Sequence, residues 1–377
     1  MLEQLNLKAW PFQTVPDNDF AKVWAGRRVT KEQINGLLRR MQISPKSSLR
    51  LLWANFGMGK THTLLHIKHL CSQTGSTLVP IYAVMPNRPA SFLDIYRAIV
   101  SELPYEFLGE QLVKVGYQAP GGVALHPMFA RTPGLVNALL AMRSGEIERV
   151  TAARQWLSAQ PGLSARELRT INVTYRIKTA EDAIQALTAL TKLATFNAKT
   201  PAKLVVLLDE YQRIGELKTS TRAEVNAGMH GYFNANPSGL EMFLSFSFGR
   251  QENVAYLLSG ELKSRAAPET LNLDVLGKAE ALEFLHELLD TFRLKPDGRW
   301  AYPFSSEALE SMVEHIARTK ALTPRRLMLY GDHILQQSII LRTNDPSSEI
   351  TTQMVQRWLS DPALGSLDMD EPAPVAS

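Results

Sequence analysis

The chain has 377 residues, of which 45% are hydrophobic and 21% are charged, as in soluble globular proteins of two or three domains. No apolar run approaches the roughly 18–20 residues that span a bilayer, and the first ten residues lack a secretory pattern, so we expect no membrane partner. A single cysteine, Cys71, excludes an internal disulfide and a cysteine-based metal site, and it favours the cytoplasm.

Charge is distributed unevenly along the chain. The net charge is +4, and residues 361–377 hold four acids and no bases, so residues 1–360 carry +8. A dense basic run with one acid, Glu32, occupies residues 27–50. It could contact the phosphate backbone of DNA, or it could form a solvated helix face. Its bases are Arg27, Arg28, Lys31, Arg39, Arg40, Lys46 and Arg50.

The first hundred residues predict alternating helices and strands after an irregular, proline-containing start. Helical spacing of apolar residues predicts a helix over about 30–41, and the apolar run 48–54 predicts a buried strand that leads into a Gly-rich turn. Further along we predict a helix over 62–71, a strand over 78–84 and a helix over 91–103.

The middle of the chain interrupts this alternation. Residues 105–200 lack strand patterns and contain Pro-Gly breaks between helical stretches, which predicts a mainly helical insertion. The apolar run 203–210 (KLVVLLDE) then predicts a strand covered on both faces, as in a parallel sheet. Two more strands are predicted over 241–248 and 271–276, and the whole pattern favours a doubly wound α/β domain.

The C-terminal part has a purely helical pattern, which indicates a separate lid domain. We therefore expect an α/β P-loop core (1–104 and 200–276), a helical insertion (105–199), a helical lid domain (277–360) and a disordered acidic tail (361–377). The lid helices are predicted at about 278–292, 305–319, 323–342 and 350–360.

The turn after the first predicted strand has the composition of a phosphate-binding loop. Gly57 and Gly59 allow tight backbone conformations, and a helix N-terminus follows, so backbone N–H groups can surround a triphosphate. Lys60 should reach the β- and γ-phosphates, and Thr61 should bind Mg²⁺. The cofactors expected are therefore ATP and Mg²⁺. The other nucleotide-binding candidates at this loop are Met58 and His62.

A second motif lies at the end of the strand over 203–210. Asp209 is expected to hold the Mg²⁺ shell, and Glu210 to polarise the attacking water, which favours hydrolysis over binding alone. At the end of the next strand Ser247, or alternatively Ser245, could orient that water.

Arginines provide candidates for charge stabilisation during phosphoryl transfer. Arg325, favoured over Arg326, opens a lid helix and could fold over the nucleotide. Arg265, with Arg250 as a weaker candidate, could reach the nucleotide of a neighbouring subunit.

The order of these motifs resembles the AAA+ ATPases, and most closely the origin-recognition and initiator branch with the transposition regulators. Trp24–Arg27 resembles the Gly-Arg box of that branch, which implies that Gly26 and Arg27 lie near the adenine. Asp209–Gln212 is similar to an Asp-Glu-x-Gln motif, and Thr323–Arg325 to a second sensor. The resemblance implies a homo-oligomeric ring or filament, DNA association and a switch role.

Two stretches in the predicted insertion carry a narrower resemblance. Residues 153–157 and 165–169 resemble the ATP-binding proteins of bacterial phage-defence islands, such as BREX-type systems. The sequence departs from the AAA+ pattern in having Ala54 where the phosphate-binding motif usually opens with glycine, serine as the first sensor, and a long interval between Lys60 and Asp209.

Two functions from different classes remain open on the sequence. The first is an ATP-hydrolysing AAA+ switch that assembles on DNA and controls a partner effector protein. The second is a signalling or scaffold NTPase that changes conformation on binding ATP and does not use DNA. A protein unfoldase is disfavoured because no clear aromatic pore loop follows the second predicted strand.

Overall fold

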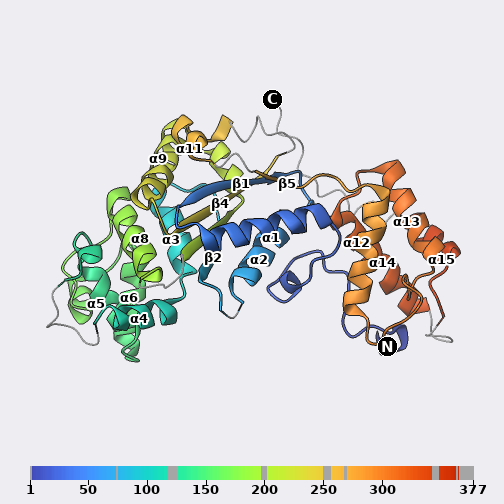
Figure 1. Ribbon diagram of the computed structural model, residues 1–377, viewed down its shortest axis with the longest axis horizontal. Coiled ribbons are helices and arrows are strands. Elements are labelled where there is room, and N and C mark those ends of the chain that lie inside the picture. The colour runs from blue at the N-terminus through green and yellow to red at the C-terminus, as the bar shows by residue number, and fades with distance from the viewer. Residues whose placement is uncertain are drawn as a thin grey trace. The chain divides into compact units, whose positions relative to one another are not determined.

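The computed structural model describes residues 2–73, 75–117, 125–196, 202–248, 256–266, 270–341, 348–361 and 364 (Figure 1). The chain divides into two compact units, one within residues 1–34, 54–69 and 272–377, the other within 35–53 and 70–271. The Gly-rich loop thus groups with the C-terminal helices, whereas the sequence-based division kept it in the α/β core. The tail expected at 361–377 lies almost entirely outside the described residues.

A five-stranded parallel sheet forms the centre of the second unit, which confirms the predicted α/β class. Its order is β2-β3-β4-β1-β5, so the chain leaves and re-enters the sheet several times. Every residue of β3 is buried, as its apolar sequence predicts. The strands are β1 (Ser48–Ala54), β2 (Leu78–Val84), β3 (Lys203–Asp209), β4 (Leu240–Ser247) and the short β5 (Leu271–Asn272).

Three helices of this unit pack on one another, namely α3 (Phe92–Ser101), α8 (Ala180–Ala194) and α9 (Thr219–Ala235). Two of them, α3 and α8, also pack against the strands β2 and β3. Ser91 caps α3 by accepting a hydrogen bond from its backbone, and Asp94 completes a capping box. The helical turn η4 (Tyr211–Glu216) follows β3, and α11 (Gly260–Arg265) packs on α9.

The described residues between β2 and β3 form helices joined by loops, and they contain no strand. Apart from α3 and α8, these helices are α4 (Tyr105–Lys114), η3 (Pro127–Phe129), α5 (Gly134–Met142), α6 (Ile147–Leu157) and α7 (Ala165–Thr170). Figure 1 shows α4, α5 and α6 gathered together, in teal and green. Trp156 is buried there, and its Nε1–H donates to the Tyr175 carbonyl at 2.6 Å.

The first unit contains the lid helices and a second hydrophobic core, which also includes Phe12 and Phe20 from the N-terminal segment. Helix α1 (Arg28–Ile43) and helix α2 (Lys60–Cys71) each begin in this unit. No helix in the described part of the chain is both long and apolar enough to cross a membrane. The remaining helices are η1 (Leu2–Leu5), η2 (Phe20–Lys22), α12 (Lys278–Phe292), α13 (Ser306–Thr319), α14 (Pro324–Leu341) and α15 (Thr352–Leu359).

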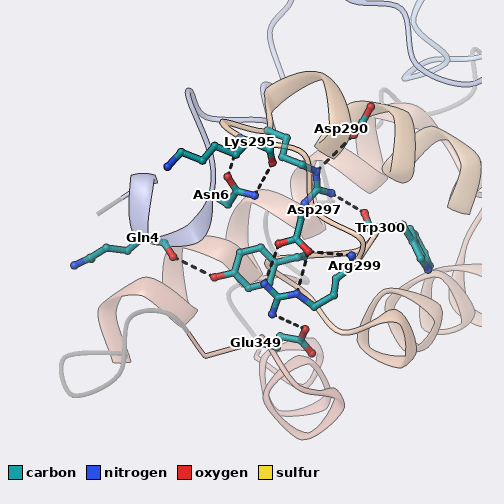
Figure 2. A network of polar contacts seen from close by, with 10 residues as sticks. Gln4, Asn6, Asp290, Lys295, Asp297, Arg299, Trp300 and Glu349 are labelled. Atoms are coloured by element: carbon teal, nitrogen blue, oxygen red, sulfur yellow. Dashed lines mark hydrogen bonds and ion pairs between the residues drawn. The ribbon is translucent and has the colours of Figure 1, made fainter.

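Polar contacts join the N-terminal residues to the loop after α12 (Figure 2). The Asn6 side chain donates to the Lys295 carbonyl at 2.8 Å and accepts from the Lys295 N–H at 2.9 Å. In the same loop Arg299 pairs with Asp297 and Glu349 at 2.9 and 3.2 Å. The Arg299 guanidinium lowers the pKa of Asp297 to about 2. The first residues of the chain therefore belong structurally with the C-terminal helices.

A buried charge cluster connects three neighbouring strands of the second unit. The Glu241 carboxylate on β4 is fully buried, and its oxygens lie 2.5 Å from Arg50 Nε on β1 and 2.9 Å from Lys203 Nζ on β3. Both cations are also buried, and this carboxylate helps to offset their loss of hydration, together with the Lys46 carbonyl that accepts from Lys203 Nζ at 2.6 Å. Arg50 therefore does not belong to an accessible basic surface, contrary to its place in the basic run of the sequence.

We predict that Glu241→Ala lowers the free energy of unfolding by about 3–5 kcal/mol, because it removes the negative charge that two buried cations share. Urea unfolding followed by circular dichroism measures this loss. The matched control is Glu314→Ala, which breaks exposed pairs with Lys278 and Arg318 and should cost about 1 kcal/mol or less. Equal losses in the two variants would contradict this account of the cluster.

Candidate functional site

The loop between β1 and α2 has a backbone that requires glycine at two positions. Gly57 and Gly59 have φ values of +77° and +89°, which L side chains rarely adopt. A Cβ on Gly57 would also lie 3.2 Å from the Arg325 Cβ, whereas a Cβ on Gly59 would meet no atom within 4 Å. The loop is therefore tightly constrained at Gly57 and has open space beside Gly59, as a cradle for an anion needs.

Lys60 occupies the first position of α2, directly after this loop. Its side chain is only 5% exposed, and Nζ donates to the carbonyls of Ala54 and Asn55 at 3.2 and 2.9 Å. The ammonium thus lies at the loop, where the N-terminal N–H groups of α2 also favour a negative charge. Thr61 is the second residue of the helix, half-buried beside Lys60. These residues fit the phosphates of a nucleotide and its Mg²⁺ by their chemistry.

The two candidate lid arginines have different surroundings. Arg325 is exposed, its N–H donates to the Gly57 carbonyl at 3.2 Å, and its guanidinium lies 4.8 Å from the ring centre of Phe56. Arg326 is buried and donates to the Ala321 carbonyl at 3.0 Å. Arg325 therefore lies at the loop, whereas Arg326 contributes to the structure of the lid.

The Gly-Arg pair before α1 also contacts this unit. The Gly26 N–H donates to Glu287 Oε2 at 2.8 Å. Arg27 Nη2 donates to the Asp274 carbonyl at 2.8 Å and lies 3.9 Å from Met58 Sδ in the loop. Burial lowers the pKa of Arg27. Arg27 thus connects the N-terminal segment with the loop, and Met58, which is 2% exposed, packs inside.

The histidines of α2 hold the N-terminal segment. His62 Nε2 lies 2.9 Å from the Val23 carbonyl, and His66 Nδ1 lies 2.7 Å from the Ala21 carbonyl. Within the described residues no group of three or more His, Cys, Asp or Glu side chains could hold a metal ion. The hydrogen-bond partner of His62 in the structure is therefore the backbone of the N-terminal segment. Burial, and to a smaller extent the neighbouring His66, lowers the pKa of His62 to about 4.

This lowered pKa predicts a loss of stability in mild acid. The folded state disfavours the protonated form of His62. The contribution of neutral His62 to the free energy of unfolding is therefore complete above the ordinary pKa of 6.5 and is lost as the pH falls toward about 4. Scanning calorimetry between pH 7.5 and 5 should show a falling Tm, and His62→Gln, which keeps a donor for Val23, should flatten part of that fall. The same substitution at exposed His286 should not change the slope.

Asp209, at the end of β3, is surrounded by hydrogen-bond donors. Asp209 is 1% exposed, and its Oδ1 accepts from Ser245 Oγ at 2.5 Å and from the Glu210 N–H at 2.9 Å. Its Oδ2 accepts from the Tyr82 hydroxyl at 3.1 Å. The side chains on β2 and β4 therefore fix the orientation of a carboxylate at the end of β3.

Of the two serines considered for the end of β4, Ser245 is the one that contacts the acid. The Ser245 side chain is fully buried against Asp209, whereas the Ser247 N–H donates to Gln212 Oε1 at 3.1 Å. Ser245 and Ser247 are two residues apart on β4, so their side chains lie on the same face of the sheet, and Ser245 is the one that reaches Asp209. Gln212 belongs to the Asp-Glu-x-Gln motif, but the sequence alone does not predict its contact with Glu210, because that contact depends on the conformation of the turn between them.

Glu210 follows Asp209 in a left-handed conformation, with φ of 59° and ψ of 32°. Its Oε2 accepts a hydrogen bond from Gln212 Nε2 at 2.6 Å. Arg265 is exposed at the last position of α11, and Arg250 lies outside the described residues.

The structure thus groups the predicted residues by unit. The loop with Lys60, Arg325, Arg27 and Met58 belongs to the first unit, and Asp209 with Glu210 and both serines belongs to the second. Because the strands are parallel, β1 and β3 end at the same edge of the sheet.

No family model matches this sequence, and no curated protein matches it. Among solved structures, ORC2 of Aeropyrum pernix in ADPNP–ADP complexes is similar, with a TM-score of 0.52 and 14% identity over 89% of this chain and 69% of that chain. ORC1 of the same organism in complex with DNA has a TM-score of 0.49 and 14% identity, over 91% and 67%. A Walker-type ATPase of Pyrococcus abyssi has a TM-score of 0.49 and 13% identity, over 87% and 72%. At this identity the likeness to ORC2 concerns the fold alone.

Proposed function

We propose that this chain is a Mg²⁺-dependent AAA+ switch that binds and hydrolyses ATP, oligomerises, and acts on DNA, on a partner effector protein, or on both. The observation that carries the proposal is the loop after β1. Two glycines at positive φ are followed at once by a buried lysine at the first position of a helix. Such a loop presents several backbone N–H groups and one ammonium to a triphosphate.

Different residues bind the phosphates and the Mg²⁺ ion. Lys60 binds the β- and γ-phosphates, and the Thr61 hydroxyl and Asp209 carboxylate are the oxygen ligands that Mg²⁺ prefers. Bound Mg²⁺ would neutralise phosphate charge during transfer. Ser245 and Tyr82 support this assignment because they orient the Asp209 carboxylate from both neighbouring strands.

Hydrolysis requires a base and cationic groups beside the phosphates. Glu210 accepts a proton from the attacking water, and Arg325 stabilises charge on the transferred group. The exposed Arg265 acts on the nucleotide of a neighbouring copy. Either Ser245, through its contact with Asp209, or Ser247 orients the water. Gly26 and Arg27 contact the adenine of the nucleotide, and Met58 and His62 are the further nucleotide-binding residues at the loop.

We predict that Lys60→Ala weakens ATP binding at least about tenfold, because it removes the cation at the phosphates. Glu210→Gln should keep ATP affinity but lower turnover about 100-fold or more, and the ATP-bound oligomer should accumulate. Titration with a fluorescent ATP analogue, phosphate release and light scattering after size exclusion measure the three effects.

The matched controls are Lys68→Ala on the same helix and Glu216→Gln in the turn that follows Glu210. Both should bind and hydrolyse ATP as the wild type does. Turnover by Glu210→Gln at the wild-type rate would refute the assignment of the base.

A basic surface on α1 supports the DNA part of the proposal. The outer side of this helix, opposite buried Ile34 and Leu37, exposes several bases. The surface is smaller than the sequence suggests, because Arg50 is buried against Glu241 and Arg27 donates to the Asp274 carbonyl. The exposed bases on α1 are Arg28, Lys31, Arg39 and Arg40, and exposed Lys46 follows the end of the helix.

We predict that Arg28→Ala with Arg39→Ala weakens duplex binding and makes it less dependent on salt, by about one unit of log–log slope for each phosphate contact removed. Fluorescence anisotropy from 50 to 200 mM salt measures both. Lys278→Ala with Arg318→Ala removes the same charge from the lid and is the control.

If the two arginine substitutions on α1 leave duplex binding unchanged, the α1 surface is not the DNA site. If DNA neither binds nor alters ATP turnover, the second candidate replaces the first. That candidate is a signalling or scaffold NTPase that switches without DNA, and the helical segment between β2 and β3 supports it as a docking surface.

The resemblance of residues 153–157 and 165–169 supports phage defence or mobile-element control as the setting. Buried Cys71 is consistent with the cytoplasm as the location.

A further inference from the structure

Gln212 lies between the end of β4 and the carboxylate of Glu210. Its Nε2 donates to Glu210 Oε2 at 2.6 Å, and its Oε1 accepts from the Ser247 N–H at 3.1 Å. One side chain therefore joins the residue proposed as the base to the main chain of a neighbouring strand.

The two contacts determine which way the amide faces. If the amide were reversed, its oxygen would face the Glu210 carboxylate and its NH₂ would face the Ser247 N–H, so both hydrogen bonds would become repulsive. The Ser247 N–H is a fixed part of the β4 main chain. Gln212 is thereby held with its donor toward Glu210.

The backbone of Glu210 is restrained independently of this contact. Its left-handed conformation is one that few residues other than glycine and asparagine adopt, and its N–H is bonded to Asp209 Oδ1. The next residue, Tyr211, is fully buried, and its hydroxyl donates to Asn226 Oδ1 at 3.3 Å. With the backbone held on both sides, the place of the carboxylate depends on the side-chain torsions, which Gln212 restrains.

We propose that Gln212 is a positioning residue, which holds the Glu210 carboxylate in one orientation and couples that orientation to the end of β4. The contact occupies Oε2, and Oε1 accepts no hydrogen bond from the described residues, so Oε1 is the oxygen that receives the proton of the attacking water. The inference rests on the proposed ATPase function, because Glu210 needs a fixed orientation only if it acts on water.

The test compares Gln212→Met and Gln212→Ala with the wild type. Methionine keeps about the same length and volume but makes neither hydrogen bond. Both variants should lose about 10- to 100-fold in kcat, because a displaced base loses its alignment, while the KM for ATP and the ATP affinity stay within about twofold.

The matched control is Gln185→Met. Gln185 Nε2 donates to Glu181 Oε1 at 2.6 Å on exposed α8 positions, so the control removes the same kind of bond outside the site. It should keep the wild-type kcat. A comparable loss of kcat in the control, or a rise of KM and a fall of Tm in proportion to the loss of kcat, would overturn the positioning role in favour of a structural one.

A second readout uses the nucleotide-free protein. In a protein labelled with ¹⁵N-glutamine, the Gln212 side-chain amide should show two well-separated proton signals that exchange slowly with water. Glu210→Ala should bring these signals together, whereas Glu216→Ala should leave them unchanged. An amide signal that does not respond to Glu210→Ala would overturn the inference.

The two levels of the proposal fail differently. A wild type that does not hydrolyse ATP would overturn the proposed function, and the inference with it. A wild type that is active, is inactivated by Glu210→Gln and is unaffected by Gln212→Met would overturn only the inference.

Discussion

Asp209 is a carboxylate with almost no contact with water, and the strands around it are arranged to satisfy it. A buried carboxylate costs several kcal/mol unless donors replace its hydration. The donors here come from β2, through Tyr82, and from β4, through Ser245, so the parallel register of three strands is needed to bring them together. A one-residue slip of either neighbouring strand would turn its donor to the opposite face.

The buried Asp209 carboxylate also restricts the conformation of the residues that follow it. The Glu210 N–H is bonded to the same carboxylate, and the chain then turns through a left-handed residue into η4. That turn brings Gln212 back onto Glu210 and against the end of β4. One buried acid thus fixes the geometry of the proposed base through bonds that are local in sequence and through bonds that are not.

The loop of the first unit depends on a different constraint, which is backbone conformation. A side chain at Gly57 is disfavoured, both because of the positive φ and because Arg325 lies against it. The N–H of Arg325 is bonded to the Gly57 carbonyl, so the lid helix α14 and the loop are fixed to each other within this unit.

The sequence by itself determined the α/β class, the fully buried strand β3, the Gly-rich loop before α2 and the helical character of the lid, because each depends on local composition or on a spacing within one element. Only the tertiary structure decided that Ser245 contacts Asp209, that Arg50 is buried against Glu241, and that Gln212 holds Glu210. These pairings need the register of neighbouring strands and the direction of a turn. Hydrophobic periodicity specifies which face of a strand is buried but not which residue of another strand lies opposite.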